Sequence, residues 1–168
     1  ECDDPHSDWY QWITDPDLQQ QEITHLAGDP PSAGPGFWEL WPQYMDGSKA
    51  DMGLGALRYS VEWSRLFPSE VAAMANTIED LDQYVHQPTR AAYHQIFAGA
   101  KQRNLRLLIT LNHYSLPLWI HDGKACHDNL TFCERRGWLD RDKILKHIAL
   151  FSGWVAKEYG SDVDLWGT

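Results

Sequence analysis

Basic residues are scarce in this sequence of 168 residues: 14 Lys and Arg stand against 24 Asp and Glu, a formal net charge of −10. Proteins that bind nucleic acids present clustered Lys and Arg to the phosphates. The composition therefore argues against nucleic acid as a partner. No block of consecutive acidic residues stands out either, so we interpret the negative charge as a solvated surface rather than a binding site.

Long apolar runs are also missing. No stretch approaches the roughly 20 residues that a helix needs to span a bilayer, and no signal-peptide pattern opens the chain. These two absences argue against a membrane partner, and we expect a cytoplasmic location. Because the first residue is Glu and not Met, we also expect that the start was processed, trimmed or not observed.

Cysteine is sparse and odd in number, with three residues, which argues against a disulfide framework. Cys126 and Cys133 lie in one segment, HDGKACHDNLTFCERRG, beside His121 and His127. Their spacing matches none of the usual zinc patterns. Free thiols, a local disulfide and a metal site all stay open at this point, and our expectation is that no metal is bound.

Aromatic residues, in contrast, are plentiful, with nine Trp and seven Tyr. Aromatic rings stack on the apolar faces of sugars, and Trp also anchors interfaces. The competing interpretation is that these rings fill the core. For any single Trp, we favour the core.

Helical and strand patterns alternate along the chain. Helices are predicted near Thr14–Leu26 and over 38–52, 69–87, 89–104 and 140–160, and strands over 56–63, 105–111 and 163–168. This alternation is typical of a parallel α/β sheet. A complete eight-stranded barrel needs about 250 residues. We therefore predict an α/β fold that is a partial (β/α)8 barrel, with residues 1–168 forming an incomplete portion of one domain.

The first predicted strand has two chemically different faces. Its apolar positions, from Leu57 to Val61, are expected to face helices, whereas Arg58, Ser60 and Glu62 are expected to face the barrel interior. Arg58 can clamp a carboxylate and keep it ionised, or it can form a structural ion pair with Glu62. Glu62 can serve as a general acid or base, but two neighbouring arginines favour a structural role.

His113 is the strongest single candidate for a functional residue. It stands just past the second predicted strand, and parallel barrels carry their active sites at this end of the strands. Tyr114 and Trp119 flank it, so an imidazole that bonds a hydroxyl would lie among rings that shape a sugar pocket. The alternative is a core histidine with satisfied hydrogen bonds. The segment Leu116–Gly137 that follows reads as a long loop, and such loops are often functional.

Several segments closely resemble glycoside hydrolase family 1, the retaining β-glycosidases, and particularly its archaeal branch. DPHSDWYQWITDP and GDPPSAGPGFWELW are similar to that branch's first long loop. MGLGALRYSVEWSRLFP is similar to its second barrel strand, TLNHYSLPLWIHD to its third, and GWLDRDKILKHIALFSGWVAKEYGSDVDLWGT to its third helix and fourth strand. The resemblance covers almost the whole chain and implies strands 2 to 4 of the barrel.

The resemblance also implies roles for individual residues. His113 matches the histidine that hydrogen-bonds a sugar hydroxyl in the cleavage subsite. Tyr114 stands where the family usually has Trp, so its contact with the sugar is expected to differ. Arg58 matches the arginine that touches the nucleophilic carboxylate. Three further residues match a family segment that is structural near the site: Glu62, Trp63 and Arg65.

By the same resemblance, the parent protein hydrolyses terminal β-linked glucosides or galactosides with retention, using two glutamates about 5 Å apart. One would follow Thr168 in an Asn-Glu-Pro segment and the other lies near strand seven, so no catalytic residue is expected within this chain. The expected partners are a small β-glycoside and the rest of the barrel. A homo-oligomer stays open, and no cofactor is implied.

Two other interpretations stay open. The chain can be a non-catalytic sugar-binding or regulatory remnant of such a barrel, which keeps His113 and the aromatic rings without the two glutamates. Alternatively, it can be a metal-binding protein built on the loop that carries Cys126 and Cys133. The sequence downstream of Thr168 distinguishes the remnant from the enzyme. The metal content of the purified protein distinguishes the metal-binding protein from the enzyme.

Overall fold

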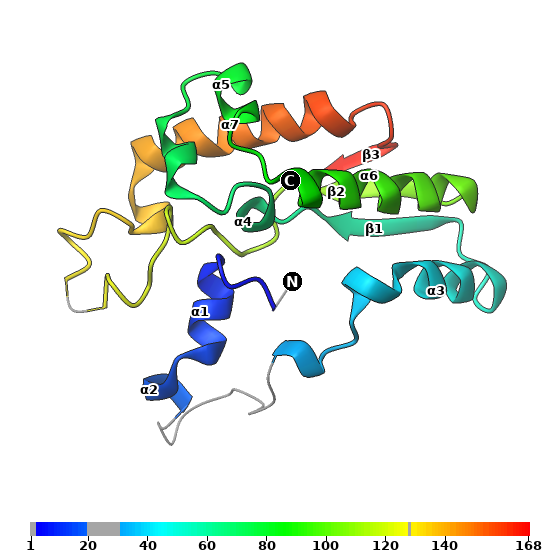
Figure 1. Cartoon of the computed structure of the whole chain (residues 1–168), viewed down its shortest axis with the longest axis horizontal. Coiled ribbons are helices and arrows are strands. Elements are labelled where there is room, and N and C mark those ends of the chain that lie inside the picture. The colour runs from blue at the N-terminus through cyan, green and yellow to red at the C-terminus, as the bar shows by residue number, and fades with distance from the viewer. Residues whose placement is uncertain (1–2, 20–30, 128) are drawn as a thin grey trace.

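The centre of the computed structural model, which describes residues 3–19, 31–127 and 129–168, is a three-stranded parallel sheet in the order β1-β2-β3. The strands span Ala56–Ser60, Arg106–Thr110 and Leu165–Gly167. Helix α6 (Gln87–Gln102) leads from β1 to β2, and α7 (Arg141–Tyr159) leads from β2 to β3 (Figure 1). The predicted α/β class and the parallel pairing are therefore confirmed.

Shorter helices surround this sheet. Ahead of β1 lie α1 (Asp8–Thr14), α2 (Pro16–Gln19) and α3 (Phe37–Ala50), while α4 (Trp63–Leu66) and α5 (Ile78–Asp82) lie between β1 and α6. Short 3₁₀ helices span Pro31–Ala33, Glu70–Met74 and Gly137–Leu139. The predicted helix near 14–26 corresponds in part to α2, and its remainder from residue 20 lies outside the described residues.

The first strand is shorter than the sequence predicts. Pairing with β2 ends at Ser60, opposite Thr110, and the chain turns at Glu62 to begin α4. Val61 and Trp63 are both only 2% exposed. The alternation of apolar residues continues across the turn because both residues enter the core, so periodicity alone does not reveal where the strand ends.

The predicted single helix over 69–87 is also wrong. The segment contains a 3₁₀ helix and then α5, which begins after Thr77. Thr77 and Asp80 form a reciprocal cap, in which each side chain accepts a hydrogen bond from the other residue's backbone N–H. Helix α6 begins at Gln87, so Pro88 lies in its first turn, where its missing N–H costs nothing. Proline here starts a helix and does not stop one.

The core lies between the sheet and its two long helices. Tyr59 of β1 contacts Tyr93 of α6, with ring centroids 6.1 Å apart, and Tyr93 in turn contacts Tyr159 of α7 at 6.1 Å. On the other parity of the sheet, the Arg58 Nε–H donates to Thr110 Oγ1 at 3.0 Å. Apolar and polar positions of β1 therefore face opposite sides, as the alternation predicts.

The tryptophans divide between the core and the surface. Trp63, Trp119 and Trp154 are buried, as the core interpretation expects. Others are exposed, among them Trp9, Trp12 and Trp138, each at 43% or more. An exposed ring of this size does not contribute its burial energy to the fold. The three residues are therefore candidates for a binding surface.

His147 of α7 is a buried histidine. Its side chain is 5% exposed, and its ring lies edge-on to Trp119 at 5.3 Å. Burial, assisted by the positive charges of the nearby Lys146 and Lys143, lowers its pKa to about 4. The folded chain therefore holds this imidazole neutral at pH values where the unfolded chain protonates it.

This burial predicts a loss of stability in mild acid. Between pH 6.5 and pH 4 the unfolded state binds a proton that the folded state refuses, so the free energy of unfolding should fall by about 2–3 kcal/mol. His147→Phe should remove that part of the pH dependence while other groups still titrate. Urea unfolding of both proteins at several pH values measures the free energy of unfolding as a function of pH. The same pH dependence in the two proteins would contradict the prediction.

Candidate functional site

A cavity of about 760 Å³ opens between α1 and the loop that follows β2. Its lining combines aromatic rings with acidic and basic side chains: Asp8, Trp9, Gln11, Trp12, Asp15, Asp17, Tyr114, His121, Gly123, Lys124, His127 and Trp138. We call this set of residues the aromatic cavity. In Figure 1, α1 in blue lies to the right of the yellow loop that carries residues 121–127.

Helix α1 is held against this loop by backbone bonds. Ser7 caps the helix by accepting from the Tyr10 N–H at 3.1 Å. The Asp8 N–H donates to the Leu116 carbonyl oxygen at 2.9 Å, and the Leu118 N–H donates to the His6 carbonyl oxygen at 2.9 Å. This segment of irregular sequence thus pairs with the loop through an isolated antiparallel bridge between Ser7 and Pro117, which fixes the position of one cavity wall.

Two tryptophans of α1 form that wall. Trp9 and Trp12 stand three residues apart, so they lie on the same face of the helix. Their ring centroids are 5.3 Å apart, and the two rings are 43% and 45% exposed. Broad, partly exposed rings beside carboxylates are the surface on which a sugar or an aromatic group stacks.

His121 and Asp8 form a hydrogen-bonded pair in the lining of the cavity. His121 Nδ1 lies 2.6 Å from Asp8 Oδ2, and Asp8 Oδ1 accepts from the Leu116 N–H at 2.8 Å. The hydrogen bond to Asp8, with its charge and that of Asp122, outweighs partial burial and raises the pKa of His121. The pair therefore ties the loop to α1 most strongly while the imidazole is protonated.

Asp122 fixes the turn that carries the opposite wall. Its Oδ1 accepts from Gln11 Nε2 at 2.8 Å and from the Ala125 N–H at 3.0 Å. Burial raises its pKa, but these hydrogen bonds and nearby positive charge outweigh that effect and lower the pKa overall. Asp122 is therefore an ionised acceptor that joins the loop to α1.

The predicted sugar-binding residues adjoin this cavity, and one of them enters it. Tyr114 is in the cavity lining, is 76% exposed, and adopts a left-handed backbone with φ 73°. A left-handed conformation is rare for a bulky residue and is found at functional sites. His113 lies against it, with ring centroids 4.6 Å apart. Among the described lining residues neither His113 nor Arg58 occurs.

The charged residues near the end of β1 have separate partners. Glu62 is 3% exposed and accepts from Ser115 Oγ at 2.7 Å, while Arg58 donates to Thr110. In the described part of the chain, no ion pair joins Arg58 to Glu62. Arg65 pairs with Asp3 and lies over the Trp38 ring. Trp63 is part of the aromatic core.

Cys126 and Cys133 form a disulfide. The local-disulfide alternative is therefore the one that the structure has, and these sulfurs are not available as thiolate metal ligands. Within residues 3–19, 31–127 and 129–168, no group of three or more His, Cys, Asp or Glu side chains is arranged to hold a metal ion. In the same ranges, no helix has both the length and the apolar character required to traverse a bilayer.

Sequence reasoning missed most of the aromatic cavity. It singled out Tyr114, but it did not connect Trp9 and Trp12 with His121 and Trp138. One signal was present, because the segment DWYQW places two Trp at helical spacing in an otherwise polar, loop-like region. The contact between residues 8 and 121 has no such signal, since it depends on how a loop folds back over more than a hundred residues.

Comparison with known proteins links this geometry to one group. Residues 45–168 match the family described as glycosyl hydrolase family 1. The chain is 31% identical over 182 residues to a β-galactosidase of Saccharolobus solfataricus, covering 99% of this chain and 36% of that protein. It is 28% identical over 173 residues to a β-galactosidase of Sulfolobus acidocaldarius, covering 92% of this chain and 34% of that one.

Solved structures agree with these sequence matches. The β-glycosidase of the hyperthermophile Thermosphaera aggregans superposes with a TM-score of 0.89 at 26% identity, over 98% of this chain and 37% of that one. The β-glucosidase of Pyrococcus furiosus gives 0.85 at 28% identity, over 96% and 37%. The chain thus spans about a third of the length of the relatives that it matches.

Proposed function

Because this chain belongs to glycosyl hydrolase family 1, we propose that it is part of a retaining β-glycosidase acting on terminal β-linked glucosides or galactosides. The observation that carries the proposal is the family match over residues 45–168. The match includes β1, β2 and β3, which we assign to strands 2 to 4 of an eight-stranded barrel. Enzymes of this architecture bind substrate at the carboxyl ends of the strands, where His113 and Tyr114 follow β2.

In the proposed mechanism, two glutamates from outside residues 1–168 perform a double displacement. One attacks the anomeric carbon, and the other protonates the leaving group and then activates water. No residue of this chain is assigned to either step. The chain instead supplies groups that hold the sugar and one of the carboxylates.

Arg58 is the proposed partner of the nucleophilic carboxylate. Its Nε–H is taken by Thr110, and this bond restrains the guanidinium plane. The two terminal nitrogens have no hydrogen bond or ion pair to another described residue, so they can form a bidentate pair with a carboxylate and keep it ionised. This geometry favours the clamp over the structural ion pair with Glu62.

His113 and Tyr114 are the proposed sugar contacts. An imidazole at the end of β2 can bond a sugar hydroxyl, and the Tyr114 ring extends from it into the aromatic cavity. We therefore place the cleaved sugar beside His113 and the leaving group in the cavity, with Tyr114 between the two. Trp9, Trp12 and Trp138 would then stack on the leaving group.

Assay on an aryl β-glucoside tests this proposal. Residues 1–168 alone should release no aryl alcohol above the uncatalysed rate, because both glutamates are missing. A longer product of the same coding region, if Asn-Glu-Pro follows Thr168, should release it and give the β-anomer first in an NMR time course.

Turnover by residues 1–168 alone would overturn the assignment of both glutamates and make Glu62 a candidate acid. Sugar binding without turnover by the longer product would favour the non-catalytic remnant.

A further inference from the structure

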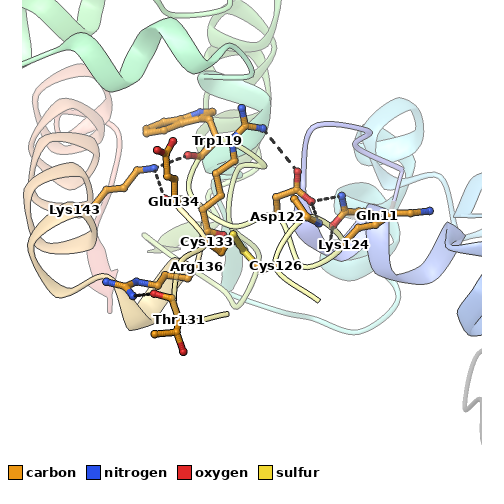
Figure 2. Close-up of a disulfide and its surroundings, with 12 residues drawn as sticks. Gln11, Trp119, Asp122, Lys124, Cys126, Thr131, Cys133, Glu134, Arg136 and Lys143 are labelled. Carbon is orange, nitrogen blue, oxygen red and sulfur yellow. Dashed lines mark hydrogen bonds and ion pairs between the residues drawn. A yellow bond between two sulfur atoms is a disulfide. The ribbon is translucent and has the colours of Figure 1, made fainter. Parts of the chain in front are cut away.

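The loop after β2 is closed on itself by the Cys126–Cys133 disulfide. The two Cα atoms lie 5.2 Å apart, within the usual range for a disulfide. Cys126 is 3% exposed, whereas Cys133 is half-buried. In Figure 2 the disulfide lies with Asp122 and Gln11 on one side and Lys143 on the other.

The inner layer of the loop forms a wall of the aromatic cavity. Gly123, Lys124 and His127 are all in its lining. This layer is bonded to α1, since the Lys124 N–H donates to Gln11 Oε1 at 3.2 Å, and Lys124 Nζ lies 3.6 Å from Asp15 Oδ2. Cys126 lies between Lys124 and His127 in the sequence, so the disulfide is attached to this wall itself.

The outer layer of the loop, which carries Thr131, Cys133 and Glu134, does not contact α1 in these bonds. It is anchored on α7 and within the loop itself. Lys143 Nζ donates to the carbonyl oxygens of Trp119 at 3.0 Å and Glu134 at 3.1 Å, and Arg136 Nη1 donates to the Thr131 carbonyl oxygen at 2.7 Å (Figure 2). The layers meet where the Asp122 N–H donates to the Arg135 carbonyl oxygen at 2.9 Å. The disulfide is the covalent link between a wall that contacts the cavity and a layer fixed to the helix.

We propose that the Cys126–Cys133 disulfide is a redox-controlled clasp that holds one wall of the leaving-group site. With the bond intact, Gly123, Lys124 and His127 stay against α1 and the cavity binds an aryl or sugar leaving group. With the bond reduced, the wall gains conformational freedom that binding must remove, so affinity falls. This inference rests on the proposed glycosidase function for the identity of the ligand, but not for the motion of the wall.

The chemistry is an exchange with a dithiol. A thiolate of the dithiol attacks the Sγ of Cys133, the more exposed residue of the two, which breaks the S–S bond, forms a mixed disulfide and releases Cys126 as a thiolate. The second thiolate of the reagent attacks the mixed disulfide and releases Cys133. Two electrons and two protons pass to the two cysteines, and the dithiol becomes a cyclic disulfide. Cys126 Sγ lies 3.1 Å from the Arg135 carbonyl oxygen, which the new thiol can use as an acceptor.

The redox environment makes such a clasp responsive. Disulfides persist in oxidising compartments, whereas glutathione and thioredoxin keep most cytosolic thiols reduced. A partly exposed disulfide in a surface loop is accessible to these reagents. The loop can therefore exist in either state according to the surroundings, while the hydrogen bonds from α1 and α7 keep it near its folded position.

The experiment compares the oxidised chain, the chain treated with dithiothreitol, and a Cys126→Ser/Cys133→Ser variant. Calorimetric titration with phenyl β-glucoside should give a dissociation constant at least ~5-fold higher for the two forms without the disulfide than for the oxidised chain. Hydrogen exchange of the Lys124 and Ala125 amides should be at least ~10-fold faster in both. Cys2→Ser is the matched control, which should keep the full response to dithiothreitol.

The two readouts separate the clasp from the function. If phenyl β-glucoside binds to none of the forms but exchange accelerates on reduction, the proposed ligand is wrong and the clasp stands. If exchange of the two amides is the same in oxidised and reduced protein, the clasp is overturned whatever the ligand does. A mass consistent with three free thiols in protein never exposed to reductant would also overturn it.

Discussion

Replacing Trp63 with alanine should destabilise the chain by about 3–5 kcal/mol, the usual cost of truncating a large aromatic core residue. Trp63 is 2% exposed and stacks on Phe151 of α7, with ring centroids 4.9 Å apart and planes inclined by 12°. It also meets Trp119 edge-on at 5.7 Å. Removing the ring therefore leaves a cavity where the end of β1, the loop and α7 meet. Equilibrium unfolding in urea measures the loss.

Trp63→Phe is the matched control for this truncation. The indole Nε1–H of Trp63 is buried, with no hydrogen-bond partner among the described residues. Phenylalanine keeps an aromatic ring against Phe151 and removes that donor, so its loss should be about 1 kcal/mol. A fall of less than about 1 kcal/mol for Trp63→Ala itself would show that this aromatic cluster does not carry the core. Exposed Trp9→Ala should change stability by less than about 0.5 kcal/mol.

Replacing His113 with alanine should lower kcat/KM on an aryl β-glucoside by ~100- to 1,000-fold, measured in a longer product of the coding region that turns over. The proposed role is a hydrogen bond to a sugar hydroxyl, and such bonds strengthen as the ring distorts in the transition state. A donor lost from an electrostatically organised site has a cost of this size. The effect should appear mainly in kcat because the bond is weaker in the ground state.

Two comparisons give the His113 result its meaning. His113→Asn retains a donor and should recover part of the lost activity. His6→Ala removes an exposed imidazole outside the proposed site and should leave kcat/KM unchanged. If His113→Ala lowers kcat/KM by less than about threefold, the interpretation of His113 as a core histidine would be favoured. The sugar would then need a different contact.

The structure also bears on Glu62, for which the sequence leaves two roles open. Its carboxyl group is buried and bonded to Ser115, while its backbone N–H donates to the Tyr93 hydroxyl oxygen at 2.8 Å. Burial leaves Tyr93 with a pKa well above its ordinary value, so it remains a neutral phenol. A carboxyl held inside such a network positions the turn into α4. This arrangement favours the structural interpretation over a general acid or base.

Much of the fold was predictable because local physics decides it. Helix α7 could be located from its cap at Asp140, which accepts from the Lys143 N–H at 3.2 Å, and from apolar residues such as Ile144 and Phe151 that recur at helical spacing. The opposite facing of Arg58 and Tyr59 follows from the pleat of a strand. These features depend on residues within one or two turns of each other, so the sequence contains enough information.

The sequence by itself determined the alternating strands and helices, the family resemblance and the position of His113 at a strand end. Tertiary structure decided which surfaces meet. The pairing of His121 with Asp8, the burial of His147 and the union of Trp9 with Trp138 in one cavity all join residues far apart in the chain. No periodicity records such contacts, because they depend on the path of an irregular loop whose backbone is held by individual hydrogen bonds and one disulfide.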